Sequence, residues 1–192
     1  ENCSSWKNGA GKTTLLRLIA GELSLDRMDR RQGPGILASR QLTVEMLGQQ
    51  ALAEEERTVE ELMMLHCPAK GLFDRERFEY EREYDTLFTG LGFQKEDKKT
   101  FCSSFSGGQK TKIALIQLLL KKPDLLLLDE PTSSLDLRHQ VEVLTTARRV
   151  ATKQGKGVIL SMHDINLAAR YADTILLMKD GGIVASGAPA DV

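Results

Sequence analysis

A run of four leucines, Leu125–Leu128, constrains the fold of this 192-residue chain more than any other feature. The run follows a Pro-Asp turn and ends in two carboxylates, which is typical of a strand buried on both faces of a parallel sheet. Similar apolar runs recur at 158–161 and 174–178, with helical patterns at 135–153 and 164–172. Strands that alternate with helices predict an α/β fold with a mostly parallel sheet. The last run turns through 180–182 into 183–186, which predicts a β-hairpin.

A strongly charged segment at 54–99 interrupts this pattern and reads as helical. We expect a short helix over 58–65 and a longer one over 74–91. The longer helix should interleave opposite charges on its outer side, and its expected buried residues are Phe78, Leu87, Phe88 and Leu91.

Composition excludes several classes of protein. The 26 basic and 27 acidic side chains give a net charge of −1, which argues against a basic nucleic-acid-binding surface and against direct DNA binding. No apolar stretch approaches the roughly 18 residues of a membrane span. Cys3, Cys67 and Cys102 are widely separated, which predicts neither a disulfide framework nor a metal site and favours a reducing cytosol.

A glycine-rich segment before an apolar helical pattern at 13–21 predicts a phosphate-binding loop of the Walker A type. Small residues let successive backbone N–H groups wrap around phosphate oxygens. Lys12 supplies a positive charge to the β- and γ-phosphates, and the hydroxyl of Thr13 is a ligand for Mg²⁺. The residues expected to contact ATP here are Asn8, Gly9, Ala10, Gly11, Lys12, Thr13 and Thr14.

Trp6 departs from this pattern because the loop normally has glycine at that position. A large side chain there should crowd the turn and weaken nucleotide binding and turnover. We therefore expect Trp6→Gly to raise ATP affinity, and an unchanged affinity in a titration would contradict this reasoning.

A second candidate anion-binding site precedes the apolar helical pattern at 113–120. It consists of Ser106, Gly107, Gly108 and Gln109 at a helix N-terminus. Taken alone, the same residues could be an ordinary helix N-cap. Further on, Asp129 suits a Mg²⁺ contact, and Glu130 is placed to activate a water for attack on the γ-phosphate. His163 ends the next strand, where a sensor of the phosphate would sit, whereas His66 and His139 read as surface residues.

In this order, the motifs closely resemble the nucleotide-binding domain of ATP-binding cassette (ABC) proteins. The resemblance implies a P-loop NTPase fold that forms one domain over 1–192. Within it, residues 1–50 and 123–192 form a RecA-like core, and residues 51–122 form a helical subdomain that carries the Ser-Gly-Gly-Gln signature. It also implies that Asp136 belongs to the D-loop and His163 is the switch histidine. Gln49, with Gln50 as the alternative, is the Q-loop glutamine, which joins Glu130 and His163 in catalysis. The Mg²⁺ ligands are then Thr13, Gln49 and Asp129.

The same resemblance implies how the protein works. Two cassettes pair head to tail, so that ATP on one Walker A loop is capped by the signature of the other cassette, and hydrolysis lets them part. It further implies that the N-terminal antiparallel strands of the family are missing from this chain, because only the polar residues 1–5 precede Trp6.

Two branches of the family share features with this sequence. Residues 163–173 and 182–189 are similar to the ATPase subunits of iron-siderophore, haem and cobalamin importers. Those subunits bind a transmembrane permease and lie on the inner face of the cell membrane, in the cytoplasm. Residues 57–61 and 108–115 are more similar to the ABC-F proteins that act on ribosomes. Ser133-Ser134-Leu135-Asp136 and the single cassette favour the importer subunit. The alternatives are a soluble ribosome-associated ATPase and a cassette with weak nucleotide binding and little turnover.

Overall fold

The computed structural model of the chain describes residues 10–23, 41–48, 52, 56–69, 71, 73–133 and 135–192. Several predictions therefore concern positions outside the described residues. These are the expectations for the segment 1–5, Trp6, Asn8, Gly9, Gln49, Gln50 and Ser134.

Three parallel strands form the centre of the fold. They are β1 (Val44–Leu47), β2 (Leu125–Asp129) and β3 (Gly157–Ser161), in the order β1-β2-β3. Residue Leu127 pairs with Met46 on one side and Ile159 on the other. Leucines 126 to 128 have no exposed surface, so the prediction of a strand buried in a parallel sheet is confirmed.

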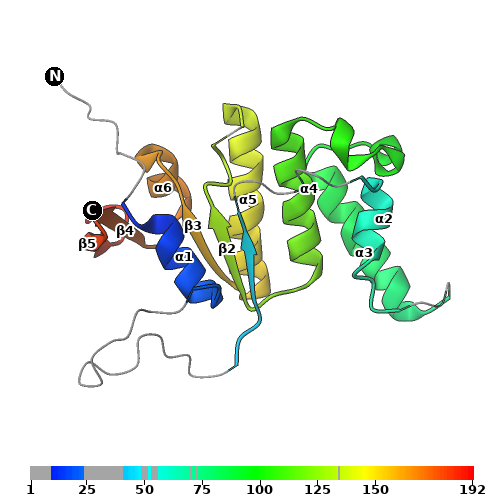
Figure 1. Ribbon diagram of the computed structural model, residues 1–192, viewed down its shortest axis with the longest axis horizontal. Helices are drawn as coiled ribbons and strands as arrows, with labels where there is room; N and C mark the ends of the chain where they lie inside the picture. Colours follow the sequence, from blue (N-terminus) through cyan, green and yellow to red (C-terminus); the bar gives the residue numbers. More distant parts are fainter. Residues whose placement is uncertain are drawn as a thin grey trace.

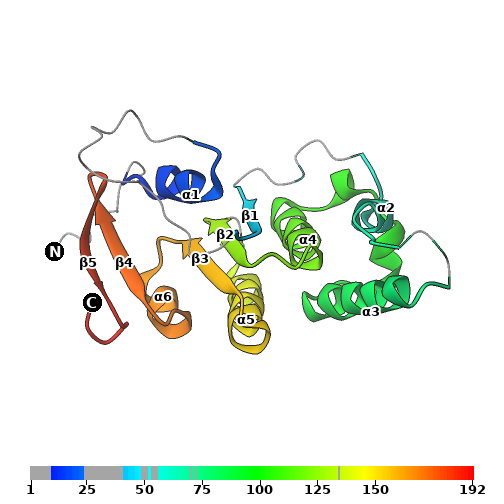
Figure 2. The same ribbon diagram turned by 90° about the horizontal axis from the view of Figure 1, so that it is seen from below.

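Helices cover both faces of this sheet. Helix α1 (Lys12–Ala20) lies on one face, and α5 (Leu137–Gln154) and α6 (Ile165–Tyr171) lie on the other (Figure 2). Helix α1 ends at Gly21, whose φ of 77° lets its N–H reach the carbonyls of Arg17 and Leu18. The three predicted helices are thus confirmed to within a few residues.

The predicted hairpin is present, but it lies outside the parallel sheet. Strand β4 (Ile175–Lys179) pairs antiparallel with β5 (Gly182–Gly187), and in the described part of the chain these two strands form a separate sheet. Asp180 and Gly181 both have positive φ, 49° and 81°, as a two-residue hairpin turn requires. The expectation that 174–178 continues the parallel sheet is wrong. Its apolar run is only partly buried, with Leu176 51% exposed, and the composition of a strand does not specify its partner.

The charged segment forms a helical block beside β1 (Figure 1). The block contains α2 (Val59–Met64), α3 (Arg75–Gly90) and α4 (Gly107–Leu120), with two short 3-10 helices at Lys95–Lys99 and Cys102–Ser104. The helices expected at 58–65 and 74–91 are therefore confirmed. One hydrophobic core runs from β2 through α4 and α5 into α2 and α3 without interruption. The block and the sheet consequently support each other's packing.

The buried face of α3 differs from the expected one. Leu87, Phe88 and Leu91 are buried as predicted, but Phe78 is 68% exposed. Phe78 and the buried Tyr80 are two positions apart, which is about 200° around a helix of 3.6 residues per turn. The helix therefore buries Tyr80 and Tyr84 and leaves Phe78 on the opposite side.

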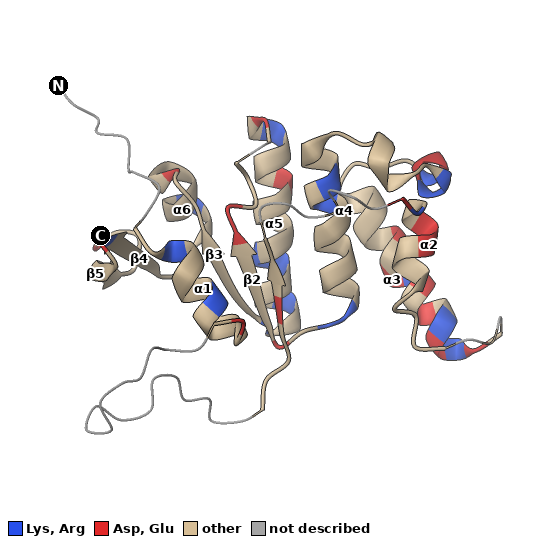
Figure 3. Cartoon of the chain, viewed as in Figure 1, with Lys and Arg blue, Asp and Glu red and all other residues tan. Residues whose placement is uncertain are grey.

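Residues of both charges follow one another along α3, as the sequence predicts (Figure 3). Arg75 pairs with Glu79 and Arg77 with Glu81, each at 2.8 Å and four residues apart. Within the described ranges, no helix combines the length and the apolar character that crossing a membrane requires.

Candidate active site

The end of the phosphate loop lies against the hairpin turn between β4 and β5. The carbonyl of Ala10 accepts a hydrogen bond from the Gly181 N–H at 3.3 Å. Gly11 has a φ of 89°, and a Cβ at this position would lie 3.4 Å from the Gly181 Cα. The backbone conformation therefore favours glycine at position 11, whereas the 3.4 Å distance alone would admit a Cβ. Helix α1 starts immediately afterwards, so Lys12, Thr13 and the exposed Thr14 occupy its positive N-terminal end.

The hydroxyl of Thr13 and the carboxylate of Asp129 are brought into direct contact. Thr13 Oγ1 donates to Asp129 Oδ2 at 2.8 Å, although 116 residues separate them in the sequence. Asp129 ends β2 and is only 3% exposed. Two of the expected Mg²⁺ ligands therefore lie side by side at one end of the sheet.

Ser161, at the end of β3, contacts both acidic residues of the site, the side chain of Asp129 and the backbone of Glu130. Its Oγ donates to Asp129 Oδ1 at 2.6 Å and accepts the backbone N–H of Glu130 at 2.9 Å. Our sequence reasoning assigned no role to Ser161. The available signal was its position, because the ends of β2 and β3 are adjacent in a parallel pair and Ser161 lies opposite Asp129.

Glu130 has a left-handed backbone conformation with a φ of 49°. A non-glycine residue in this region is strained, and such conformations persist where surrounding contacts impose them. Here the N–H is held by Ser161, and the carbonyl accepts bonds from the N–H and the hydroxyl of Ser133. The sharp turn after the strand lets Asp129 and Glu130 point to different partners.

Lys12, His163 and Glu130 form a compact network. His163 Nε2 lies 2.5 Å from Glu130 Oε1, and Lys12 Nζ lies 3.2 Å from His163 Nδ1. Lys12 Nζ is also 3.6 Å from Glu130 Oε1. Because an ammonium can only donate, a neutral imidazole with its proton on Nε2 satisfies both ring contacts. The ring thus connects the ammonium of Lys12 to the carboxylate of Glu130.

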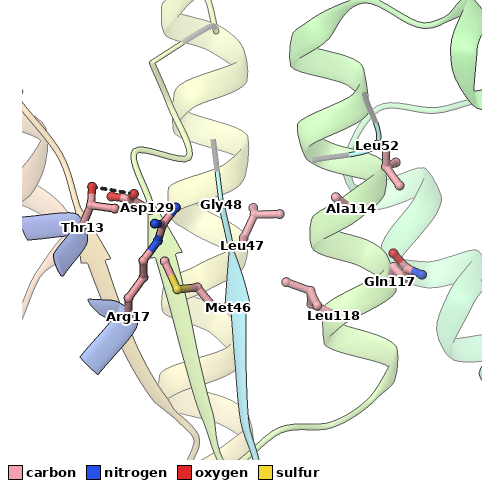
Figure 4. A pocket seen from close by; sticks show the side chains of 10 residues that line it. All are labelled: Thr13, Arg17, Met46, Leu47, Gly48, Leu52, Ala114, Gln117, Leu118 and Asp129. Atoms are coloured by element: carbon pink, nitrogen blue, oxygen red, sulfur yellow. Dashed lines mark hydrogen bonds between the residues drawn. The ribbon is translucent and has the colours of Figure 1, made fainter. Parts of the chain in front are cut away.

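A cavity of about 600 Å³ opens beside the Thr13–Asp129 contact (Figure 4). Its walls come from α1, from the ends of β1 and β2, and from α4. Arg17 extends from α1 toward Asp129, and Gln117 lines the opposite wall. Gly48, the residue before the predicted Q-loop glutamine, also lines this cavity.

The signature residues lie apart from this cluster, on the other side of β1 from α1 (Figure 2). Ser106 is the N-cap of α4: its hydroxyl accepts the N–H of Gln109, and the Gln109 side chain accepts the N–H of Ser106. Gly107 and Gly108 form the first turn. The plain N-cap reading is therefore correct for the local structure, and the phosphate loop and signature are not brought together within this chain in its described part.

Asp136 occupies the start of α5 in a similar way. Its carboxylate accepts the His139 N–H at 3.0 Å and lies 3.0 Å from His139 Nδ1. The backbone hydrogen bond from His139 is the main reason why the pKa of Asp136 is lowered. His139 therefore lies on the surface, as expected, but it has a specific partner.

The arrangement described so far defines a class of protein: a P-loop ATPase cassette, with a phosphate loop at one helix start and paired carboxylates at a strand end. A sequence model of the family described as "ABC transporter" matches residues 7–133. The hemin import ATP-binding protein HmuV of Rhodopseudomonas palustris strain BisB18 is 39% identical over 96% of this chain and 71% of that protein. This chain belongs to the ABC transporter family. It is an ATP-binding subunit that hydrolyses ATP for transport.

Solved structures agree with this assignment. An ATP-binding subunit of an ABC transporter matches with a TM-score of 0.73 and 27% identity, over 96% of this chain and 77% of that one. A dimeric ATP-binding cassette in a post-hydrolysis state, bound to ADP and Pi, matches with a TM-score of 0.71 and 21% identity, over 94% of this chain and 81% of that one. The second likeness establishes the fold alone. The relatives favour the importer reading, and none of these findings supports a ribosomal partner.

Proposed function

We propose that this chain is the ATPase subunit of an importer for haem or a chemically related iron complex. The observation that carries the proposal is the convergence of Lys12, Glu130 and His163 beside the Thr13–Asp129 contact. The 39% identity to a hemin import subunit supports the choice of substrate class.

The roles of the site residues follow from their positions. Ammonium and backbone N–H groups at the start of α1, with Asn8, Gly9 and Ala10 before it, bind the phosphates of ATP. Glu130 accepts the proton of the attacking water. His163 orients Glu130 through their 2.5 Å contact and responds to the γ-phosphate, and Gln49 completes this sensor.

The donor set at Thr13 and Asp129 suits Mg²⁺, which prefers hydroxyl and carboxylate oxygens and is usually held by one or two carboxylates together with substrate phosphates. Thr13 and Asp129, with Gln49, would hold the ion. When bound, it neutralises charge that develops on the phosphates. Ser161 then keeps the carboxylate of Asp129 in place through its 2.6 Å bond.

Two copies of the cassette are needed to complete a site in this proposal. The signature residues Ser106, Gly107, Gly108 and Gln109 form a helix N-terminus that lies apart from the chain's own Lys12, on the other side of β1 (Figure 2), so in this proposal they cap ATP on a second cassette. Asp136 belongs to the same interface. A cassette of this fold is dimeric in its post-hydrolysis state.

The variant Glu130→Gln tests the catalytic proposal. We expect it to reduce turnover by about 10²–10⁴-fold, since it removes the positioned base, and to accumulate an ATP-bound dimer. The matched control is Glu45→Gln, which removes a carboxylate that pairs with Lys121 at a surface distant from the site. Phosphate release and size-exclusion chromatography measure both effects. Turnover at the wild-type rate in Glu130→Gln would rule out this role for Glu130.

The partner in this proposal is a transmembrane permease at the inner face of the membrane. The helical subdomain at 51–122 and the Q-loop bind a helix of that permease, and the cavity lined by Arg17, Gln117 and Gly48 is the docking site. We expect Gln117→Trp, which fills the cavity from α4, to abolish co-purification with the permease. ATP-driven uptake of haem, a ferric siderophore and cobalamin by reconstituted vesicles would identify the substrate. Uptake of none of the three would contradict the importer proposal.

A further inference from the structure

A partly buried ion pair joins the helical block to α5, away from the site described above. Lys112, on α4, is only 3% exposed, and its Nζ lies 2.6 Å from Glu142 Oε2 on α5. The same ammonium donates to the carbonyl of Leu91, at the end of α3, at 3.1 Å. Lysine is almost never fully buried unless it is paired. The three contacting elements therefore meet at one ammonium group.

Glu142 is held in its charged form at this junction. Burial alone would raise the pKa of its carboxyl group, but the hydrogen bond and charge of Lys112 outweigh burial and leave the pKa below its ordinary value. Arg138 adds a second cation at 3.4 Å. Buried ion pairs stabilise folds poorly compared with apolar residues of the same volume. Stability alone is thus a weak explanation for this pair.

The two residues of the pair lie equally far from the starts of their helices. Lys112 lies six residues after Ser106, the N-cap of α4, and Glu142 lies six residues after Asp136, the N-cap of α5. At 1.5 Å per residue, each is about 9 Å from its helix start. The contact therefore fixes the position of the signature relative to the D-loop.

The start of α5 is also tied to the loop that follows Glu130. The Gln140 side chain donates to the carbonyls of Thr132 and Leu135, at 3.1 and 3.0 Å. The carbonyl of Glu130 is in turn bonded by Ser133 in the same loop. The signature helix is thus linked, through α5, to the loop whose Ser133 bonds the backbone carbonyl of Glu130.

We propose that Lys112 and Glu142 are positioning residues that hold the signature at the correct distance from the D-loop, so that one cassette can cap the nucleotide of another. This inference rests on the proposed dimeric function. It predicts that loss of the pair weakens ATP-driven pairing of cassettes while leaving ATP binding by a single cassette intact.

The test uses the purified Glu130→Gln protein as the parent, because it should accumulate the ATP-bound dimer. Two quantities are measured against ATP concentration: nucleotide binding by the monomer and the fraction of dimer. For Lys112→Met we expect the dimerisation midpoint to rise about tenfold, a coupling within the usual range, with less than about a twofold change in monomer affinity. Lys112→Arg, which keeps a cation with several donors, should restore the midpoint.

Two further variants distinguish a positioning role of the ion pair from an effect on the stability of the fold. Lys112→Met with Glu142→Leu replaces the pair by apolar residues, so it should fold stably but keep the raised midpoint. Val143→Ala, next to Glu142, opens a space in the core and should lower the melting temperature without moving the midpoint. An unchanged midpoint in Lys112→Met, or an equal rise in Val143→Ala, overturns the inference. A parent that stays monomeric with ATP overturns the proposed function, and this inference with it.

Discussion

Ser161→Ala is the most informative single substitution at this site, because it removes one atom that serves two partners. The hydroxyl is in a side chain that is 7% exposed, so water cannot easily replace it. Its removal takes a donor from Asp129 Oδ1 and an acceptor from the Glu130 N–H. Asp129 keeps its bond from Thr13, whereas the Glu130 N–H keeps no described partner.

The magnitude follows from these two losses. A hydrogen bond to a charged group contributes about 1.5–3 kcal/mol, and an unsatisfied buried N–H costs about 1–3 kcal/mol. We therefore expect Ser161→Ala to lower the free energy of unfolding by about 3 kcal/mol, or the melting temperature by about 6–12 °C for a chain of this length. Because Glu130 loses one anchor of its strained backbone, we also expect kcat to fall about tenfold or more.

The matched control is Ser133→Ala. The Ser133 hydroxyl also bonds the backbone of Glu130, donating to the Glu130 carbonyl at 3.0 Å, but the Ser133 side chain is exposed. Water can replace it, so the expected change is within about 0.5 kcal/mol. Thermal unfolding and phosphate release at saturating ATP measure both variants. If Ser161→Ala is no more destabilising than Ser133→Ala, the Ser161 hydroxyl does not hold the two carboxylates as we argue.

Five further substitutions test the packing and one surface carboxylate. The Tyr84 hydroxyl is buried with no hydrogen-bond partner in the described part of the chain, so Tyr84→Phe should leave the melting temperature unchanged or raise it. Tyr80→Phe loses a 2.5 Å hydrogen bond to a backbone carbonyl, so it should lower the free energy of unfolding by about 1 kcal/mol. Phe78→Ser should change the unfolding free energy by less than about 0.5 kcal/mol, whereas Phe88→Ala should cost about 3–5 kcal/mol in urea denaturation. Hydrogen bonds from the backbone and side chain of Thr43 lower the pKa of Asp124 from 3.8 to about 2. The charged carboxylate therefore stabilises the folded chain above pH 3.8, and this stabilisation is lost toward pH 2. Asp124→Asn should weaken the pH dependence of the melting temperature in this window.

Short-range patterns predicted the elements well because each element carries its own signals. The leucine run of β2, the glycine after α1 and the periodicity of α3 are all local. The errors concern partners and faces. The sequence of β4 fits a strand in either sheet, and α3 offers Phe78 and Tyr80 on opposite sides with similar hydrophobicity. Only the packing of α3 against α4 decides which one is buried.

The same distinction between local signals and three-dimensional partners explains which parts of the site could be predicted. Motifs placed Lys12, Asp129 and His163 at the ends of a helix and two strands, and parallel topology then brings such ends to one edge of the sheet. The backbone turn at Glu130 could not be predicted, because its φ of 49° is imposed by Ser161 and Ser133 rather than by a preference of glutamate. A serine at the end of a strand does not by itself indicate a functional role. Its role here depends on standing opposite Asp129 in the β2–β3 register, and that register is a property of the folded sheet. The residues of the candidate site are thus readable from sequence, whereas the contacts that orient them depend on the three-dimensional pairing of strands.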